Sequence, residues 1–177
     1  MKSLFKTERL LLTEAYPGDA TYFARHQLDD NFAQLSAWDV ETPRSPQRFI
    51  NMLNATNPTH FIFVMRLQST DQPLGWIELT NVSLADQTAE LGIGIFVGAQ
   101  RNHGYGREAI EGLLTWGFGE LGLFKINLSV NENNPMAIHV YEQVGFKREA
   151  TDREALLADG RWLDRYVYGL LRSDWRQ

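Results

Sequence analysis

The stretch Gln100-Arg101-Asn102-His103-Gly104-Tyr105-Gly106 decides the fold, because it joins an apolar run at residues 91–97 to a helical pattern that begins near Arg107. We interpret this junction as a strand, a tight loop and the N-terminus of a helix. The first N–H groups of a helix have no partners within the helix and carry partial positive charge. Gly104 and Gly106 let the backbone come close to a pyrophosphate, so the junction predicts a phosphate site.

A second segment reads Asn134-Pro-Met-Ala137-Ile-His-Val-Tyr141-Glu-Gln-Val-Gly145-Phe146 and predicts another helix. Pro135 suits its first turn, and Gly145 suits the position just after its end. Together with the loop, this segment resembles the acetyl-CoA-binding motifs of the GNAT superfamily of N-acetyltransferases. Those motifs run Gln/Arg-x-x-Gly-x-Gly/Ala and Asn-x-x-Ala-x-x-x-Tyr-x-x-x-Gly-Phe, and every fixed position is matched here.

Dinucleotide binding is the competing interpretation of the loop. Gly104-Tyr-Gly106-Arg-Glu-Ala109 also satisfies Gly-x-Gly-x-x-Gly/Ala, and Glu132 follows the next expected strand. A dinucleotide fold usually opens on this unit and repeats it, whereas here a long segment of other pattern precedes the loop. A P-loop is excluded because no Gly-Lys-Ser/Thr follows the glycines. The context therefore favours acetyl-CoA.

Composition suits one compact enzyme domain over residues 1–177, since 44% of the residues are hydrophobic and 12% are aromatic. The net charge is −5 and no Lys/Arg-rich run occurs, which argues against nucleic acid and suits an amine-bearing acceptor. The sequence has no cysteine, and its four histidines show no ligand spacing, so we expect no metal. It shows no signal peptide and no membrane span, and the cytoplasm is the expected location.

Periodicity predicts most of the secondary structure. We expect strands at residues 9–13, 60–67, 74–80, 88–97 and 125–130, and a final hairpin of residues 146–157 and 162–171 about a type I′ turn at Asp159-Gly160. Helices are expected through Tyr22, Phe23 and Leu28, from Ser45-Pro46 through Leu53, and from Arg107 to Gly122. Residues 29–44 show no clean period, and the family resemblance implies that such an insert shapes the acceptor pocket.

The resemblance covers most of the chain. Thr7-Glu-Arg-Leu-Leu-Leu12, Asp159-Gly-Arg-Trp-Leu-Asp164 and Leu171-Arg-Ser-Asp-Trp175 look like the ribosomal-protein N-terminal (RimJ/RimL-type) acetyltransferase branch, which also contains enzymes for polyamines and other small molecules. It implies a mixed α/β (α+β) GNAT fold, with a mostly antiparallel central sheet of about six to seven strands and about four flanking helices. Strands four and five would splay apart.

The resemblance also implies how acetyl-CoA, the cosubstrate, would bind. Its pyrophosphate would meet backbone N–H groups of residues 102–107, and its pantetheine would pair with the edge of the strand ending at Val97. An N–H near Phe96 or Val97 would polarise the thioester carbonyl. The expected binding set is Ile95, Phe96, Val97, Arg101, Asn102, His103, Gly104, Tyr105, Gly106, Arg107 and Asn134. Arg101 and His103 are equally well explained as solvated loop side chains, and Asn134 as a helix N-cap.

Tyr141 matches the motif tyrosine that resembles the family's general acid toward the departing CoA thiolate; its alternative is a core aromatic. A phenol is a weaker acid than a thiol, so we expect hydrogen-bond stabilisation more than complete proton transfer. Glu90 and Glu78 are the candidate bases. Glu90 ranks first because it shares a strand face with Gly92 and Gly94, which would leave a trough beneath it. An exposed glutamate and a water relay remain open alternatives.

These features predict an N-acetyltransferase that transfers the acetyl group of acetyl-CoA directly to a primary amine in a ternary complex. The amine could belong to a protein N-terminus, a polyamine or another small molecule. The alternative is a non-catalytic acyl-CoA-binding or sensor domain. The sequence does not decide the acceptor, the acyl chain length or the oligomeric state, for which a homodimer is one option.

Overall fold

The computed structural model describes residues 3–26, 45–53, 57–96, 100–158 and 160–175. Within these ranges, eight strands form one sheet in the order β1-β2-β3-β4-β5-β6-β8-β7. The strands are β1 (Ser3–Lys6), β2 (Leu10–Thr13), β3 (Phe61–Leu67), β4 (Pro73–Ser83), β5 (Thr88–Ile95), β6 (Lys125–Asn131), β7 (Lys147–Ala158) and β8 (Arg161–Leu171). The helices of the described residues are α1 (Asp19–His26), α3 (Pro46–Leu53), α4 (Tyr105–Gly119) and α5 (Pro135–Val144).

The expected elements are present, with three differences. Strand β1 was missed because its four residues are too few to establish an alternating pattern. Helix α4 ends at Gly119 with Glu120 as its C-cap, before the predicted end at Gly122, which adopts a positive φ of 67° in the following turn. Leu28, residues 29–44 and Asp159 of the predicted hairpin turn lie outside the described residues.

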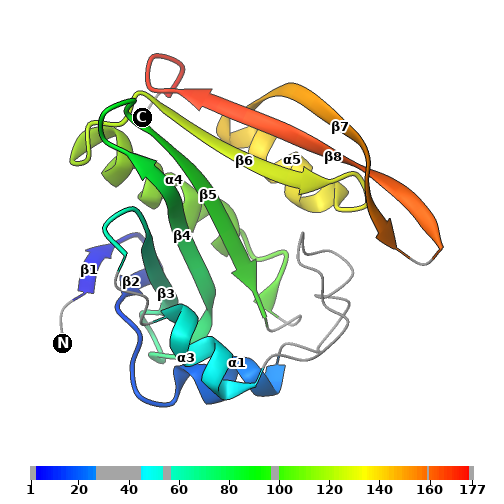
Figure 1. Ribbon diagram of the computed structural model, residues 1–177. Coiled ribbons are helices and arrows are strands. Elements are labelled where there is room, and N and C mark those ends of the chain that lie inside the picture. Colours follow the sequence, from blue (N-terminus) through cyan, green and yellow to red (C-terminus); the bar gives the residue numbers. More distant parts are fainter. Residues whose placement is uncertain (1–2, 27–44, 54–56, 97–99, 159, 176–177) are drawn as a thin grey trace.

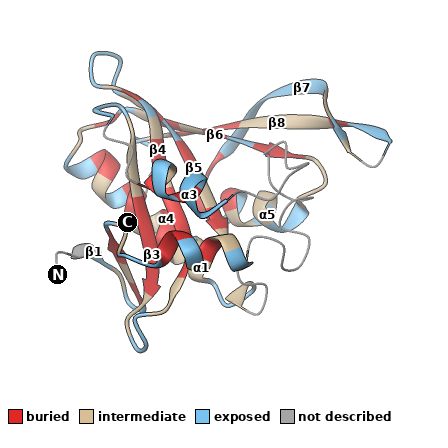
Figure 2. Cartoon of the chain, turned by 60° about the horizontal axis from the view of Figure 1, so that its bottom comes forward, coloured by how far each residue is buried: buried red, intermediate tan, exposed pale blue. Residues whose placement is uncertain are grey.

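Side-chain alternation divides the sheet into two faces. Phe63, Ile77 and Leu91 belong to the core cluster beneath α4 and α5, whereas Val64 and Trp76 belong to a second cluster with α1 and α3. Figure 1 shows these two pairs of helices on opposite sides of the sheet. Figure 2 shows the buried residues gathered in the central strands, while β7 is largely exposed. No helix in the described ranges is both long and apolar enough to cross a membrane.

A buried ion pair fastens α1 to the sheet. Asp19 begins α1 and accepts a hydrogen bond from Arg66 of β3, and the two residues are only 5% and 3% exposed. The same guanidinium donates to Thr13 Oγ1 at 3.2 Å and lies 3.7 Å from the ring centroid of Tyr16. Since breaking a buried pair leaves an unpaired charge, this contact holds α1 firmly in place.

The sheet opens between β5 and β6, its parallel pair. The two strands pair only at Thr88↔Lys125, Ala89↔Ile126 and Glu90↔Asn127, although both continue beyond these residues. On its other side, β6 stays paired with β8 along its whole length. The predicted splay between strands four and five is therefore confirmed; it falls at β5 and β6 because β1 adds one strand to the count.

Candidate active site

A cavity of roughly 400 Å³ lies at this opening. Its walls come from the diverging parts of β5 and β6, the loop before α4, the first turns of α4, and α5. Trp76 and Glu78 of β4 line it from the α1 and α3 face, whereas Ile110 and Tyr141 line it from the α4 and α5 face. The cavity therefore connects the two faces of the sheet.

The loop before α4 has the backbone geometry of an anion site. Gly104 is the N-cap in the left-handed conformation, with φ 79°, and no side chain caps this terminus. Helical bonding starts with Glu108, whose N–H donates to the Gly104 carbonyl at 3.0 Å. The N–H groups of Tyr105, Gly106 and Arg107 precede that bond and border the cavity. They form a positively polarised socket that suits a phosphate group.

Gly106 keeps the socket open. A Cβ placed there would meet a single heavy atom within 4 Å, the Ile95 Cδ1 at 3.8 Å. The space next to the Gly106 Cα is therefore almost free of protein atoms, and Gly106 borders the cavity. Asn102, with a positive φ of 63°, turns the chain just before the socket. Left-handed residues in such a loop, here Asn102 and Gly104, help direct its backbone N–H groups toward a bound anion.

Arg101 and His103 have structural partners. The Arg101 guanidinium donates from Nε to the Ile95 carbonyl at 3.1 Å and from Nη2 to the Phe96 carbonyl at 3.3 Å. His103 is exposed and is not among the residues that line the cavity. Its Nδ1 lies 2.7 Å from the Arg101 carbonyl, and its ring stacks on Tyr105. These contacts favour the structural interpretation of both side chains, with the socket built from backbone.

The structure corrects the role expected for Phe96. Its N–H donates to the Leu74 carbonyl at 3.0 Å, and its side chain is fully buried. Because N–H groups along a strand alternate between the two neighbouring strands, the groups of Ile93 and Ile95 face the opening toward β6. These residues border the cavity, so an extended pantetheine would pair with them. Val97 lies outside the described residues.

Helix α5 begins and ends as the sequence predicts. The Asn134 side chain accepts a hydrogen bond from the Ala137 N–H at 3.1 Å, which makes it the N-cap, and it also borders the cavity. Pro135 occupies the first turn. Gly145 ends the helix with φ 113°, a conformation in which a side chain would be strained.

Tyr141 combines the two roles considered for it. It is 8% exposed, belongs to the main core cluster and packs edge-on against Phe146, with ring centroids 6.1 Å apart. It also lines the cavity. Burial raises the pKa of Tyr141 to about 12, so its hydroxyl stays protonated at neutral pH. Tyr141 is therefore a hydrogen-bond donor at the opening in the sheet.

The trough expected beneath Glu90 is occupied by other side chains. Glu78 lies opposite Gly92, and a Cβ on that glycine would come 2.7 Å from Glu78 Oε1. Trp76 covers Gly94 in the same way. Glu90 is exposed at the last position where β5 pairs with β6, and it is not among the residues that line the cavity. The two glycines thus make room for Trp76 and Glu78 across the strand.

Glu78 has a histidine partner that the sequence pattern did not reveal. His60 Nε2 lies 2.7 Å from Glu78 Oε2, and both side chains are mostly buried, at 18% and 15% exposed. His60 directly precedes β3, and the pairing Ile62↔Glu78 places it diagonally across from the carboxylate. Only this register brings together two residues 18 positions apart. Within the described ranges, no three His, Asp or Glu side chains gather into a metal site.

This arrangement can bring two substrates together from opposite sides. The socket and the edge of β5 suit a phosphate-bearing, extended thioester such as acetyl-CoA. Glu78 lines the other side and contacts His60, so its carboxylate is placed to receive a proton there. The reacting atoms would meet between the diverging strands, next to the Tyr141 hydroxyl.

Comparison with known proteins agrees with this geometry. Residues 9–147 match the family model described as an acetyltransferase (GNAT) domain. The chain is 34% identical over 159 residues to the spermidine N(1)-acetyltransferase of Vibrio cholerae, covering 88% of this chain and 89% of that protein. It is 26% identical over 169 residues to the uncharacterized N-acetyltransferase YnaD of Bacillus subtilis, covering 96% and 97% of the two chains.

A solved structure shows the same fold. The spermidine N-acetyltransferase from Vibrio cholerae in complex with CoA and spermine superposes with a TM-score of 0.80 at 25% identity, covering 94% of this chain and 97% of that one. These relatives support catalysis over the alternative of a non-catalytic sensor. The chain therefore belongs to the GNAT acetyltransferases and carries out acetyl-CoA-dependent acetylation of an amine.

Proposed function

We propose that this enzyme acetylates an alkyl primary amine by direct attack on acetyl-CoA in a ternary complex, with Glu78 as the proton acceptor. The cavity that joins the two faces of the sheet carries this proposal, because it lets the donor and the acceptor enter from opposite sides. The sequence contains no cysteine, so no acyl-cysteine intermediate can form on it, which favours direct attack of the amine on the thioester.

Glu78 takes the role first assigned to Glu90 because of where the two carboxylates lie. An alkyl ammonium has a pKa of about 10.4, so only about one part in a thousand is neutral at pH 7.4. Attack on the thioester therefore requires a group that accepts the proton, directly or through one water. Glu78 lines the cavity and is held at its Oε2 by His60, whereas Glu90 is exposed outside it.

Once the amine nitrogen bonds to the thioester carbon, the tetrahedral intermediate collapses and the C–S bond breaks. The Ile93 and Ile95 backbone faces the opening and would hold the extended donor beside β5. The departing thiolate gains negative charge, and the Tyr141 hydroxyl is the buried donor at this point. We assign Tyr141 to stabilising that sulfur by a hydrogen bond rather than by complete proton transfer.

Polyamines are the proposed acceptors. They carry alkyl primary amines, and the relative with 34% identity is a spermidine N(1)-acetyltransferase. The net charge of −5 and the Glu78 carboxylate favour a cationic acceptor over an acidic one. The resemblance to the ribosomal-protein N-terminal branch makes a protein N-terminus the competing acceptor. Its α-ammonium group has a pKa of about 7.7–8.0, well below the value of about 10.4 for an alkyl ammonium.

An acceptor screen tests this proposal. The purified enzyme is incubated with acetyl-CoA and spermidine, spermine, a monoamine of similar length or a short peptide with a free N-terminus. Thiol release gives the rate, and mass spectrometry identifies the acetylated product. A higher kcat/KM for the polyamines supports the proposal. Turnover of the peptide alone would replace polyamines with protein N-termini, and no turnover of any amine despite acetyl-CoA binding would refute amine acetylation by this site.

A further inference from the structure

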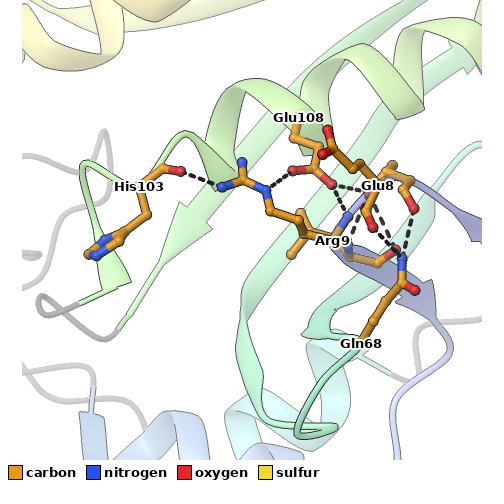
Figure 3. A network of polar contacts seen from close by, with 7 residues as sticks. Glu8, Arg9, Gln68, His103 and Glu108 are labelled. Atoms are coloured by element: carbon orange, nitrogen blue, oxygen red, sulfur yellow. Dashed lines mark hydrogen bonds and ion pairs between the residues drawn. The ribbon is translucent and has the colours of Figure 1, made fainter.

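The turn between β1 and β2 forms hydrogen bonds with the first turn of α4, although the reaction proposed above does not use these bonds. Figure 3 shows the contacts. Arg9 donates to the Glu108 carboxylate from its backbone N–H at 2.6 Å and from Nε at 2.7 Å. The Thr7 hydroxyl donates to the same carboxylate at 2.5 Å. Glu108 thus receives three hydrogen bonds from residues about a hundred positions earlier in the chain.

The Arg9 guanidinium also contacts the phosphate socket itself. Its Nη1 donates to the His103 carbonyl at 2.9 Å, and its Cζ lies 4.7 Å from the ring centroid of Tyr105. A Cβ placed on Gly104 would lie 3.3 Å from Arg9 Nη2. Arg9 therefore lies against three consecutive residues of the loop and contacts the carbonyl of His103 and the ring of Tyr105.

The turn that carries Arg9 is itself anchored to the sheet. The Gln68 side chain, just after β3, donates to the Thr7 carbonyl at 2.7 Å and the Glu8 carbonyl at 3.1 Å. The Gln68 N–H donates to the Arg9 carbonyl at 2.9 Å. A continuous set of hydrogen bonds therefore runs from the end of β3, through the turn, to the loop before α4 (Figure 3).

The charges of Arg9 and Glu108 affect how well the socket can hold a phosphate. Burial alone would raise the pKa of Glu108, but the hydrogen bonds from Thr7 and Arg9 outweigh it and hold that pKa below its ordinary value. Glu108 is therefore ionised, and it directly follows the socket residue Arg107. Paired with Arg9, its negative charge is locally compensated. Unpaired, it would oppose a pyrophosphate bound in the same helical turn.

We infer that Arg9 is a positioning residue for the pyrophosphate of acetyl-CoA. By its hydrogen bond to the His103 carbonyl, Arg9 orients the loop so that the N–H groups of residues 105–107 converge on the phosphate. By pairing with Glu108, it compensates the negative charge of that carboxylate next to the phosphate. The inference rests on the proposed use of acetyl-CoA at this site. It assigns a role to the Thr7–Leu12 motif that the chemistry of acetyl transfer leaves unexplained.

Two acetyl donors distinguish this role from general stability. Acetyl-CoA carries the pyrophosphate, and S-acetylpantetheine is a truncated donor that lacks it. In Arg9→Ala, we expect the Kd of acetyl-CoA to rise about tenfold by calorimetry, with kcat at saturating acetyl-CoA unchanged. The kcat/KM for S-acetylpantetheine should equal that of the parent enzyme. Arg9→Lys, which keeps the charge but loses the planar fork, should give an intermediate Kd.

Lys147→Ala is the matched control, because it removes another exposed cation with a carboxylate partner, Asp174 at 2.6 Å. It should leave both donors unaffected. Equal losses with both donors in Arg9→Ala, or an unchanged Kd for acetyl-CoA, would overturn the inference. If Arg9→Ala does not fold, the same comparison is made with Arg9→Lys. A parent enzyme that does not bind acetyl-CoA would instead refute the proposed function.

Discussion

Replacing Tyr141 with phenylalanine tests the chemistry at the opening in the sheet. The ring is 8% exposed and packs edge-on against Phe146, and the substitution preserves that packing. It removes only the hydroxyl, which burial holds in its protonated form by raising the pKa of Tyr141 to about 12. The substitution therefore separates a role in leaving-group chemistry from a role in the core.

The expected loss follows from the energetics of the hydroxyl. Complete transfer of its proton to a thiolate with a pKa of about 8.5 would be uphill by about 5 kcal/mol, which favours a hydrogen bond in the transition state. A hydrogen bond to a charged acceptor contributes about 1.5–3 kcal/mol. The kcat of Tyr141→Phe should therefore fall between about 10-fold and about 150-fold, with the Kd of acetyl-CoA unchanged.

Steady-state thiol release measures kcat, and calorimetry measures acetyl-CoA binding. A pH series adds a second check. Because the folded pKa of about 12 lies above the unfolded value of about 10, Tyr141 contributes stability below pH 10 that is lost as the pH rises toward 12. Tyr141→Phe should lack that part of the alkaline loss. Normal turnover with a lowered melting temperature would refute the reasoning, since it would make Tyr141 a core residue only.

Four further substitutions test the socket, the base and the fold. Gly104→Val places a β-branched residue at φ 79°, so the acetyl-CoA Kd should rise at least about tenfold, and unchanged affinity by calorimetry in a folded variant would contradict the loop assignment. Glu78→Gln should lower turnover and flatten the rise of kcat/KM with pH for spermidine, whereas Glu90→Gln should match the parent; the reverse result would return the base to Glu90. Asp19→Ala leaves Arg66 buried without its carboxylate, so urea denaturation should show a loss of about 3–5 kcal/mol, and a loss below about 1 kcal/mol would show that the pair is not structurally important.

Much of the fold is readable from local sequence because the rules that govern it are local. Asn134, Pro135 and Gly145 mark the ends of α5, since helix termini need a capping acceptor at one end and a left-handed residue at the other. The alternation of β3 to β5 predicts which side chains enter the two cores. The glycine loop predicts the phosphate socket for the same reason, because its donors are the backbone of adjacent residues.

What the sequence by itself determined is therefore the family, most elements and the cosubstrate loop. Only the tertiary structure decided which groups meet. Strand pairing assigns the Phe96 N–H to Leu74 and brings His60 to Glu78, and it leaves Glu90 exposed. The contact between Arg9 and Glu108 joins residues 99 positions apart. Such contacts depend on register and on the packing of whole elements, which one-dimensional patterns do not encode, because a strand shows which face a side chain occupies but not which neighbour it will face.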